Sequence, residues 1–311
     1  MRVSVVLCTH TMDRYDALAE AAGSVLDQTH DDVELVLVSD GDPTVHERMV
    51  ADFGDRPDVR THLMGDNVGL LRARNAGAEV ATGEVVAFID DDAIADGRWI
   101  ERLVEAYEER DRVAAGGKMT PAWVAGRPTF LPEEFYWIVG VTHRGFGPDG
   151  NAEREGEVRN TLGSNISFER EAFLDLGGFE ADIGGRKGDN HLQGGETELC
   201  ARLREVYGEG VWYVPDAEVA HKVYDYRTDP RWLAERAFWQ GYSKRGMERF
   251  VPESAGEEGE FLGRLLFEYV PARLSRLARR PTREGAEQLV AIGLFTALVG
   301  FGYLYGIVKW R

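Results

Sequence analysis

Residues 85–92 read VVAFIDDD, an apolar run that ends in three consecutive carboxylates, Asp90, Asp91 and Asp92. Such a run is typical of a strand buried on both faces of a sheet. Open α/β sheets bind ligands beyond the carboxyl ends of their strands. Carboxylates placed there predict a site for a hard divalent cation, Mg²⁺ or Mn²⁺, which would neutralise a diphosphate. The alternative is a solvated acidic turn, which an acid-rich chain also produces.

The first part of the chain alternates apolar runs with helical patterns. The runs predict strands at Val3–Cys8, Val33–Val38, Val59–Met64, Glu84–Ile89 and Val113–Met119. The patterns between them predict helices at Asp13–Gln28, Pro43–Phe53, Gly69–Val80 and Trp99–Glu109. This alternation predicts an α/β fold with a mostly parallel sheet flanked by helices.

Later elements are less regular. Strands are expected at Asn165–Phe168 and Val211–Val214, the second extending toward Val219, and helices at Glu196–Tyr207, Asp229–Arg249 and Glu260–Leu277. Residues 120–160 lack periodicity, which is typical of a loop-rich substrate region.

The composition narrows the function classes. The 311 residues carry 54 acids against 36 bases, a net charge of −18, and only five of the bases are lysines. Such a surface repels nucleic acid. An excess of acids with few lysines suits a protein that stays soluble in high salt. Cys8 and Cys200 fall in apolar patterns and are expected to be core residues rather than a disulfide pair. No secretion signal is expected at the N-terminus.

The C-terminal region predicts membrane association. Leu289–Val308 contains no charged residue, and 20 helical residues reach about 30 Å, the thickness of a bilayer's hydrocarbon core. Five arginines precede it, at positions 273, 276, 279, 280 and 283, as expected of a cytoplasmic flank. A single C-terminal anchor facing the cytoplasm is favoured over a buried core helix. Composition leaves open whether the helix spans the membrane or lies in it.

Five fragments resemble the family 2 glycosyltransferases, which have the nucleotide-sugar-binding GT-A fold. They are VSVVLCT (3–9), SVLDQTH (24–30), ELVLVSDGD (34–42), NVGLLRARNAGAEVATGEVVAFIDDDA (67–93) and GSNISF (163–168). The resemblance covers most of residues 1–220. It implies a UDP-sugar donor bound in residues 1–119 and an acceptor-binding, catalytic half in 120–225. Juxtamembrane amphipathic helices at 226–285 and a transmembrane segment at 286–311 would follow.

The resemblance also implies roles for residues at the strand ends. Thr9 would line the nucleoside pocket, and Asp40 would accept a hydrogen bond from the uracil N3–H. Asn67 opens the fragment whose Arg74 and Asn75 lie near the nucleotide in the family. The alternatives are a turn acid for Asp40 and an ordinary surface arginine for Arg74.

The metal ligands follow from the same resemblance. Asp92 would be the primary ligand and Asp90 would complete the acid-x-acid pattern, while Asp91 would face the ribose or the second shell of the metal. His221 is a further candidate ligand, although a lone histidine is more often structural.

The catalytic base is expected at the start of a helix. In the family an acid-acid-x-acid pattern precedes a leucine, and here Gly195 replaces its first acid. The position favours Glu196 as base. Successive helical side chains turn by about 100°, so Glu196 and Glu198 should point apart. The alternative is a pair of acids that complement the helix dipole. Arg186 and Lys187, in a glycine-rich loop, would close on the donor diphosphate or on an acidic sugar.

Further stretches resemble glycosyltransferases of haloarchaeal N-glycan assembly that act on lipid-linked sugars. Among them are LPEEFYWIVG (131–140), GRKGDNH (185–191) and FWQGYSKR (238–245). This resemblance implies inverting transfer from UDP-glucuronate to dolichyl-phosphate-linked glucose. Two alternatives remain, namely an enzyme that adds the first sugar directly to the lipid phosphate, and a non-catalytic scaffold that binds nucleotide sugar.

Overall fold

The computed structural model describes residues 1–183, 192–251 and 255–310. Two compact units divide the chain. The first, here called the sheet unit, comprises Met1–Thr120, Glu153–Gly184 and Gly195–Lys222. The second, the helical unit, comprises Pro121–Ala152, Gly185–Gly194 and Val223–Arg311.

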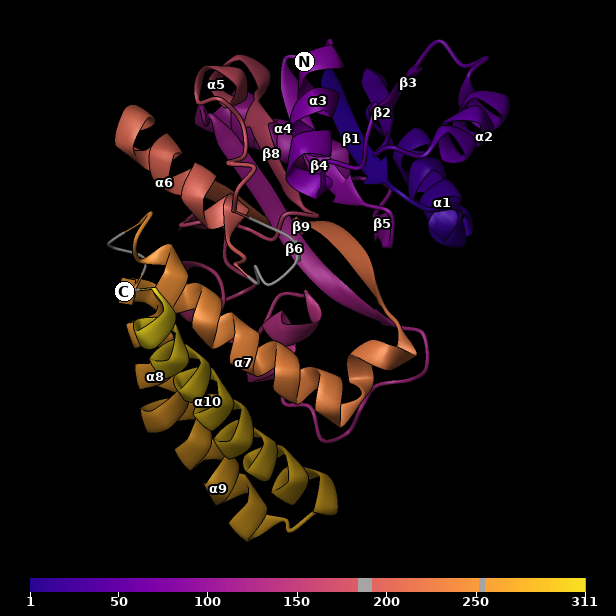
Figure 1. The fold of residues 1–311 in the computed structure, drawn as a ribbon. Coiled ribbons are helices and arrows are strands. Elements are labelled where there is room, and N and C mark those ends of the chain that lie inside the picture. Colours follow the sequence, from indigo (N-terminus) through magenta and orange to yellow (C-terminus); the bar gives the residue numbers. More distant parts are fainter. Residues whose placement is uncertain (184–191, 252–254, 311) are drawn as a thin grey trace. The chain divides into compact units, whose positions relative to one another are not determined.

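The sheet is parallel at one side and antiparallel at the other (Figure 1). Four strands form the parallel part in the order β3-β2-β1-β4: β1 (Val3–Thr9), β2 (Val33–Ser39), β3 (Val59–Leu63) and β4 (Val85–Asp90). The remaining strands are β5 (Ala93–Ala95), β6 (Ala114–Trp123), β7 (Gly156–Val158), β8 (Ile166–Glu169) and β9 (Val211–Val223). β8 pairs antiparallel with both β4 and β6, so the parallel pattern predicted from the apolar runs holds for the first four strands.

One strand is longer than the sequence pattern indicated. The apolar pattern ended at Val219, but β9 continues to Val223. His221 therefore lies inside the strand, opposite Ala93 of β5, rather than after the strand's end. Buried and partly exposed residues alternate along β9, as expected of a strand, and this alternation continues past the polar residue His221.

Helices cover the sheet. In the sheet unit they are α1 (Tyr15–Leu26), α2 (Pro43–Phe53), α3 (Leu70–Val80), α4 (Trp99–Arg110), α5 (Arg170–Asp175) and α6 (Gly195–Tyr207). One core, between β1, β2, β4 and β8 and the helices α3, α5 and α6, is built around the edge-to-face and tilted rings of Phe88, Phe168, Phe173 and Phe179. Both cysteines are free and buried in this core, as predicted.

The helical unit contains α7 (Pro230–Met247), α8 (Ala255–Arg264), a π-helical turn (Leu265–Tyr269), α9 (Val270–Arg279) and α10 (Arg283–Lys309). Helical structure runs without a break from Ala255 to Arg279, so the helix predicted over Glu260–Leu277 is present, with a π-helical turn in its middle and Pro271 in the first turn of α9. Among the described helices, α10 is long and apolar enough to cross a membrane.

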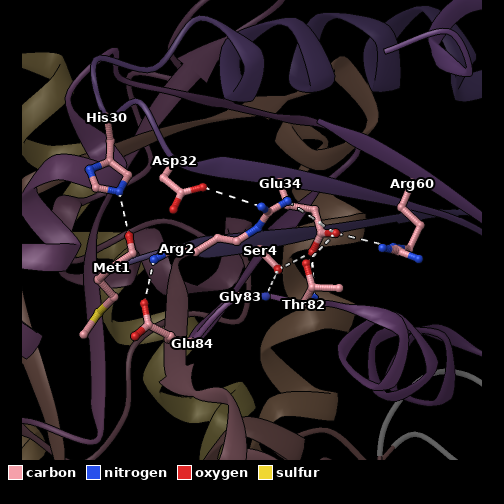
Figure 2. A network of polar contacts seen from close by, with 10 residues as sticks. All are labelled: Met1, Arg2, Ser4, His30, Asp32, Glu34, Arg60, Thr82, Gly83 and Glu84. Atoms are coloured by element: carbon pink, nitrogen blue, oxygen red, sulfur yellow. Dashed lines mark hydrogen bonds and ion pairs between the residues drawn. The ribbon is translucent and has the colours of Figure 1, made fainter. Parts of the chain in front are cut away.

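A buried carboxylate ties together the amino ends of the parallel strands (Figure 2). Glu34 of β2 accepts hydrogen bonds from Ser4 Oγ (2.5 Å), Thr82 N (2.8 Å) and Thr82 Oγ1 (2.9 Å), and Arg60 Nε lies 3.4 Å away. Burial alone would raise the pKa of Glu34, but these donors outweigh it and lower the pKa. Glu34 is therefore an ionised, fully bonded structural residue that fixes the register of three strands.

Candidate active site

The carboxyl ends of the parallel strands bring the predicted residues to one edge of the sheet. Thr9 is level with Ser39, and Cys8 is level with Asp90. Thr9, Asp40 and Asp90 consequently stand at the ends of three adjacent strands, as the alternating pattern predicted. The other site residues in the described part of the chain belong to the same sheet unit.

Asp91 lies at the centre of this edge. Its Oδ2 accepts a hydrogen bond from Thr9 Oγ1 (2.7 Å), and its Oδ1 accepts one from Arg14 Nη1 (2.8 Å). Burial raises the pKa of Asp91, and although Thr9 and Arg14 oppose the change, the neighbouring Asp92 and Asp90 reinforce it, so the net shift is upward. Asp91 is thus a buried acid whose ionised form is held at a cost.

Asp92 and His221 form the part of the cluster best suited to a cation. His221 Nε2 lies 3.2 Å from Asp92 Oδ1, and both side chains are buried. The backbone fixes the pair, because Lys222 N donates to Asp92 O (2.8 Å). One carboxylate and one imidazole are few ligands, but Mg²⁺ and related ions in phosphate-handling sites take only one or two protein ligands beside the phosphates and water. The donor set therefore fits a divalent cation held jointly with a diphosphate.

The described residues contain no cluster of three histidine, cysteine or acidic side chains arranged to hold a metal by themselves. Asp90, predicted as a second ligand, has one oxygen engaged elsewhere, since its Oδ1 lies 2.6 Å from Arg74 Nη2. Its direct coordination of a metal stays a prediction.

Arg74 links the acidic edge of the sheet to Glu196, the predicted base. Its guanidinium reaches Asp90 through Nη2 and Glu196 Oε1 through Nη1 at 3.3 Å. The side chain is almost completely buried against the rings of Phe88 and Phe179, at 5.7 Å from each centroid. Burial works against its charge, but Asp90 and Glu196 outweigh burial and raise the pKa of Arg74. Arg74 is therefore a buried, charged bridge rather than a surface arginine.

The two acids at the start of α6 point in different directions and have different partners, as helix geometry predicted. Glu196 faces Arg74, whereas Glu198 forms a paired ion bridge with Arg202 four residues later (2.7 Å from both Arg202 Nε and Nη2). The family's additional acid at position 195 would require the Leu71 side chain to move, because a Cβ at Gly195 would lie 2.5 Å from Leu71 Cδ1. Glu196 is the acid of this pair that belongs to the site.

A glycine makes room for Glu196. A Cβ on Gly163 would lie 2.0 Å from Glu196 Oε1 and 2.7 Å from Arg74 Nη1, closer than real Cβ contacts allow. The neighbouring Ser164 Oγ accepts a hydrogen bond from Asp90 N (2.9 Å). The segment that begins at Gly163 thus packs its backbone directly against Glu196 and Arg74.

Asp40 shapes the loop that leads into α3. Its carboxylate oxygens accept hydrogen bonds from Val68 N (2.8 Å) and Gly69 N (2.9 Å). Gly41, with φ of +82°, allows the turn after β2 to contact the loop before α3, because a Cβ at position 41 would lie 2.1 Å from Asn67 N. A carboxylate has about four acceptor positions, so Asp40 can still accept a hydrogen bond from a nucleobase. The uracil contact of Asp40 and the nucleotide contact of the exposed Asn67 remain predictions.

Asn75 holds a backbone segment. Its Nδ2 donates to Phe179 O and its Oδ1 accepts from Phe179 N, both at 2.9 Å. A role near the nucleotide stays a prediction. Arg186 and Lys187 lie outside the described residues.

Electrostatics of the cluster favour a cation. Four carboxylates, those of Asp90, Asp91, Asp92 and Glu196, share the guanidinium groups of Arg14 and Arg74. Among the described residues, these four carboxylates and two guanidinium groups carry two more negative than positive charges when all are ionised, a difference that one divalent ion balances. Buried charge without a partner is costly, so this edge is suited to bind positive charge.

Sequence comparison assigns the chain to a family. A model of glycosyl transferase family 2 matches residues 4–177. The chain belongs to this family. A glucosyl-dolichyl phosphate glucuronosyltransferase of Haloferax volcanii is 49% identical over 309 residues, which cover 99% of this chain and 97% of that protein. An uncharacterized glycosyltransferase of Nostoc is 37% identical over 114 residues, 36% of this chain and 35% of its own.

Solved structures confirm the GT-A glycosyltransferase fold. The mannosyltransferase PcManGT from Pyrobaculum calidifontis, in complex with GDP-Man and Mn²⁺, aligns with a TM-score of 0.59 and 15% identity, covering 100% of this chain and 88% of its own. GalNAc-T7 with UDP, GalNAc and Mn²⁺ aligns with a TM-score of 0.56 and 17% identity, covering 82% of this chain and 51% of its own. This family 2 chain therefore has the fold that the sequence fragments implied.

Three residues in contact with the site were not among those predicted from the sequence, namely Arg14, Gly163 and Ser164. Arg14 comes from a 3-10 turn, Met12–Arg14, directly after β1, and Gly163 and Ser164 were noted only as part of the GSNISF fragment. A basic residue five positions beyond the first strand is a signal that could have pointed to Arg14.

Proposed function

We propose that this glycosyltransferase moves glucuronate, with inversion, from UDP-glucuronate to the glucose of a dolichyl-phosphate-linked acceptor in protein N-glycan assembly. The main support is the 49% identity that extends over 99% of the chain to a Haloferax volcanii enzyme of that name. The geometry adds that a candidate base and a cation-binding edge are joined through one buried arginine.

Glu196 is the proposed base. Its carboxylate removes the proton of an acceptor hydroxyl while that oxygen bonds to C1 of the donor sugar. The bond from C1 to the UDP oxygen breaks on the opposite face, and its electron pair leaves with UDP. Arg74 positions Glu196 for this step through the contact at 3.3 Å, and holding both substrates in line supplies much of the acceleration.

Asp92 and His221 would hold a divalent cation against the diphosphate. When bound, the ion supplies charge stabilisation to the departing UDP. We propose Mn²⁺ over Mg²⁺, because an imidazole ligand such as His221 suits a softer ion, whereas Mg²⁺ favours oxygen ligands. Asp90 would complete the ligand set from its place beside Arg74.

The nucleoside would be bound by the strand ends. Asp40 accepts the uracil N3–H, while Thr9 and Asp91 line the ribose side. Asn67, Arg74 and Asn75 complete the pocket, Asn75 by holding the backbone of Phe179. Arg186 and Lys187 are proposed to contact the donor diphosphate or the glucuronate carboxylate.

The enzyme is proposed to act at the cytoplasmic face of the membrane, where the C-terminal helix α10 keeps it beside its lipid-linked acceptor. Confinement to the same surface raises the effective concentration of the acceptor.

One assay tests this function. Purified full-length protein is incubated with Mn²⁺, a panel of radiolabelled UDP-sugars, and polyprenyl phosphate with or without glucose. We expect transfer from UDP-glucuronate to the glucosylated lipid alone. Transfer to the bare lipid phosphate would reassign the acceptor. No transfer from any donor, by protein that still binds UDP, would leave a nucleotide-sugar-binding scaffold.

A further inference from the structure

Two helices of the helical unit, α7 and α10, pack directly against each other (Figure 1). A Cβ on Gly302 of α10 would lie 1.8 Å from Phe238 O, and one on Gly241 of α7 would lie 1.9 Å from Val299 O. Further along, Gly246 lies beside Trp310. Because the contact positions advance together, the helices run parallel and touch from Phe238 to Gly246.

The partner helix α7 is unsuited to the interior of a bilayer. Its 18 residues include Arg231, Glu235, Arg236, Lys244 and Arg245. If α10 crossed the membrane, its contacts would draw this charged helix into the hydrocarbon core, where ionised side chains are costly. The packing of α10 therefore opposes a spanning orientation, although its length and composition allow one.

Polar contacts hold the apolar stretch of α10 at both ends. Near its start, Gln288 accepts a hydrogen bond from Arg273 Nη1 (2.6 Å), and Arg273 also pairs with the buried Glu134 (2.7 Å). Near its end, Tyr303 Oη donates to Glu248 Oε1 (2.7 Å). The first bond joins α10 to α9, and the second joins it to the residue directly after α7, so polar contacts inside the helical unit hold α10 at two separate points.

The opposite face of α10 is apolar and exposed. Val290, Leu294, Phe301, Leu304 and Val308 are between 52 and 72% exposed, and their spacing places them on one side of the helix. The buried positions lie on the other side, at Gln288, Ala291, Ile292, Phe295, Gly302 and Gly306. A helix with one covered face and one bare apolar face is typical of an element that lies in a membrane interface.

Charge near this stripe identifies the kind of surface it meets. Arg276 and Arg279 in α9, Arg280 directly after it, and Arg283 at the first position of α10 are exposed, within a chain of net charge −18. Arg283 is 92% exposed and pairs with Glu287. Phe267 (82%) in the π-helical turn and Leu274 (53%) in α9 add exposed apolar surface. Clustered arginines beside exposed apolar side chains match anionic headgroups over acyl chains.

We propose that the protein is a monotopic membrane protein, in which α10 lies along the surface of an anionic bilayer rather than crossing it. The stripe Val290, Leu294, Phe301, Leu304 and Val308 enters the upper acyl region. The four arginines contact the phosphates of the headgroups, and α7 stays on the aqueous side. The proposal concerns the mode of attachment and does not depend on the identity of either sugar.

The depth of the stripe tests the proposal. A fluorescent label is placed on single introduced cysteines at positions 290, 301 and 308 of the full-length protein, bound to vesicles that contain anionic lipid, and its depth is measured with quenchers at known positions. We expect all three labels at one shallow depth. Positions 290 and 308 at opposite surfaces, with 301 near the bilayer centre, would overturn the proposal in favour of a spanning helix.

Vesicle binding gives a second readout. Phe301→Glu combined with Leu304→Glu should lower partitioning into anionic vesicles at least tenfold, and neutral vesicles should bind the unaltered protein less well than anionic ones. Val206→Glu is the matched control, because Val206 is an equally exposed apolar residue (65%) of the sheet unit. Unchanged partitioning of the double variant, with circular dichroism confirming that it is folded, would contradict the proposal. Labels shielded in solution without vesicles, together with a dimer, would instead assign the stripe to a second copy of the chain.

Discussion

Acids lie at opposite edges of the same parallel strands, the buried Glu34 at the amino edge and a partly buried cluster of four at the carboxyl edge, and the two sites differ in how their charge is balanced. At the amino edge, Glu34 is enclosed by donors from Ser4, Thr82 and Arg60, and its pKa is lowered (Figure 2). At the carboxyl edge, four acids share two guanidinium groups, and the pKa of Asp91 is raised. Burial raises the pKa of both Glu34 and Asp91, and the net shift is downward only for Glu34, where the hydrogen-bond donors outweigh burial.

The comparison separates structural acids from functional ones. An acid whose partners all come from the chain contributes to stability and has no need of a ligand. A cluster of acids with more negative than positive charge among its protein partners costs stability and favours the binding of a cation and its phosphates. Substitutions at the two edges should therefore affect different quantities, stability at the amino edge and activity at the carboxyl edge.

The largest effect on activity is expected for Glu196→Gln. Loss of the base should lower kcat by a factor of about 10² to 10⁴ with little change in the affinity for UDP. Glu198→Gln is the matched control two residues away, because Glu198 pairs with Arg202 rather than with Arg74. Steady-state transfer kinetics compare the two variants, and equal losses would remove the distinction between the two acids of α6.

A smaller loss is expected for Gly163→Ala, which leaves every charge in place. The added methyl group would displace Glu196 or Arg74, and a displacement of about 1 Å costs on the order of 10²-fold in rate. The loss should appear in kcat, while the midpoint of thermal unfolding changes little. A variant with normal kcat would indicate that Glu196 does not act from its present position.

At the amino edge, Glu34→Gln should cost stability and leave activity intact. The amide keeps the size of the side chain but places hydrogen-bond donors where Ser4 and Thr82 already donate, so we expect a loss of about 2 kcal/mol in the free energy of unfolding. The pKa of Glu34 is lower in the folded protein than in the unfolded chain. Its ionised form therefore stabilises the fold at pH values above the unfolded pKa, and this stabilisation is lost as the pH falls through the folded pKa. The variant lacks this contribution. Unfolding measured across the acidic range should show a flatter decline for the variant.

The smallest effect, opposite in sign, is expected for Asp91→Asn. The pKa of Asp91 is higher in the folded protein than in the unfolded chain. The protonated side chain therefore contributes stability that is fully present below the unfolded pKa and is lost as the pH rises through the folded pKa. Removing the charge should therefore stabilise the metal-free protein at neutral pH, by less than the loss expected for Glu34→Gln. Denaturant unfolding without added metal checks this, and a destabilisation as large as that of Glu34→Gln would erase the difference between the two edges.

Local sequence patterns could predict much of this arrangement. Apolar runs located the four parallel strands, and because their carboxyl ends share an edge, Thr9, Asp40 and Asp90 could be placed together before any coordinates. Helix periodicity correctly separated Glu196 from Glu198. These are properties of single elements, and the sequence encodes them directly.

Contacts between distant segments could not be predicted in this way. Arg14 reaches Asp91 across 77 positions, and Arg74 reaches Glu196 across 122. Glu34 resembles an ordinary polar residue in an apolar strand until Ser4 and Thr82 are placed around it. The charged residues of α7 are the ground for the proposed orientation of α10, and their packing against α10 could not be read from the 20 apolar residues that alone predicted a membrane segment.

Manganese binding tests the central contrast most directly. Electron paramagnetic resonance of Mn²⁺ titrated into the metal-free protein with UDP should show a bound ion for the wild type and for Glu34→Gln, and a loss of at least tenfold in affinity for Asp92→Asn. Equal binding by Asp92→Asn and wild type would contradict the account, because the carboxyl edge would then not be the place where charge from a cation is needed.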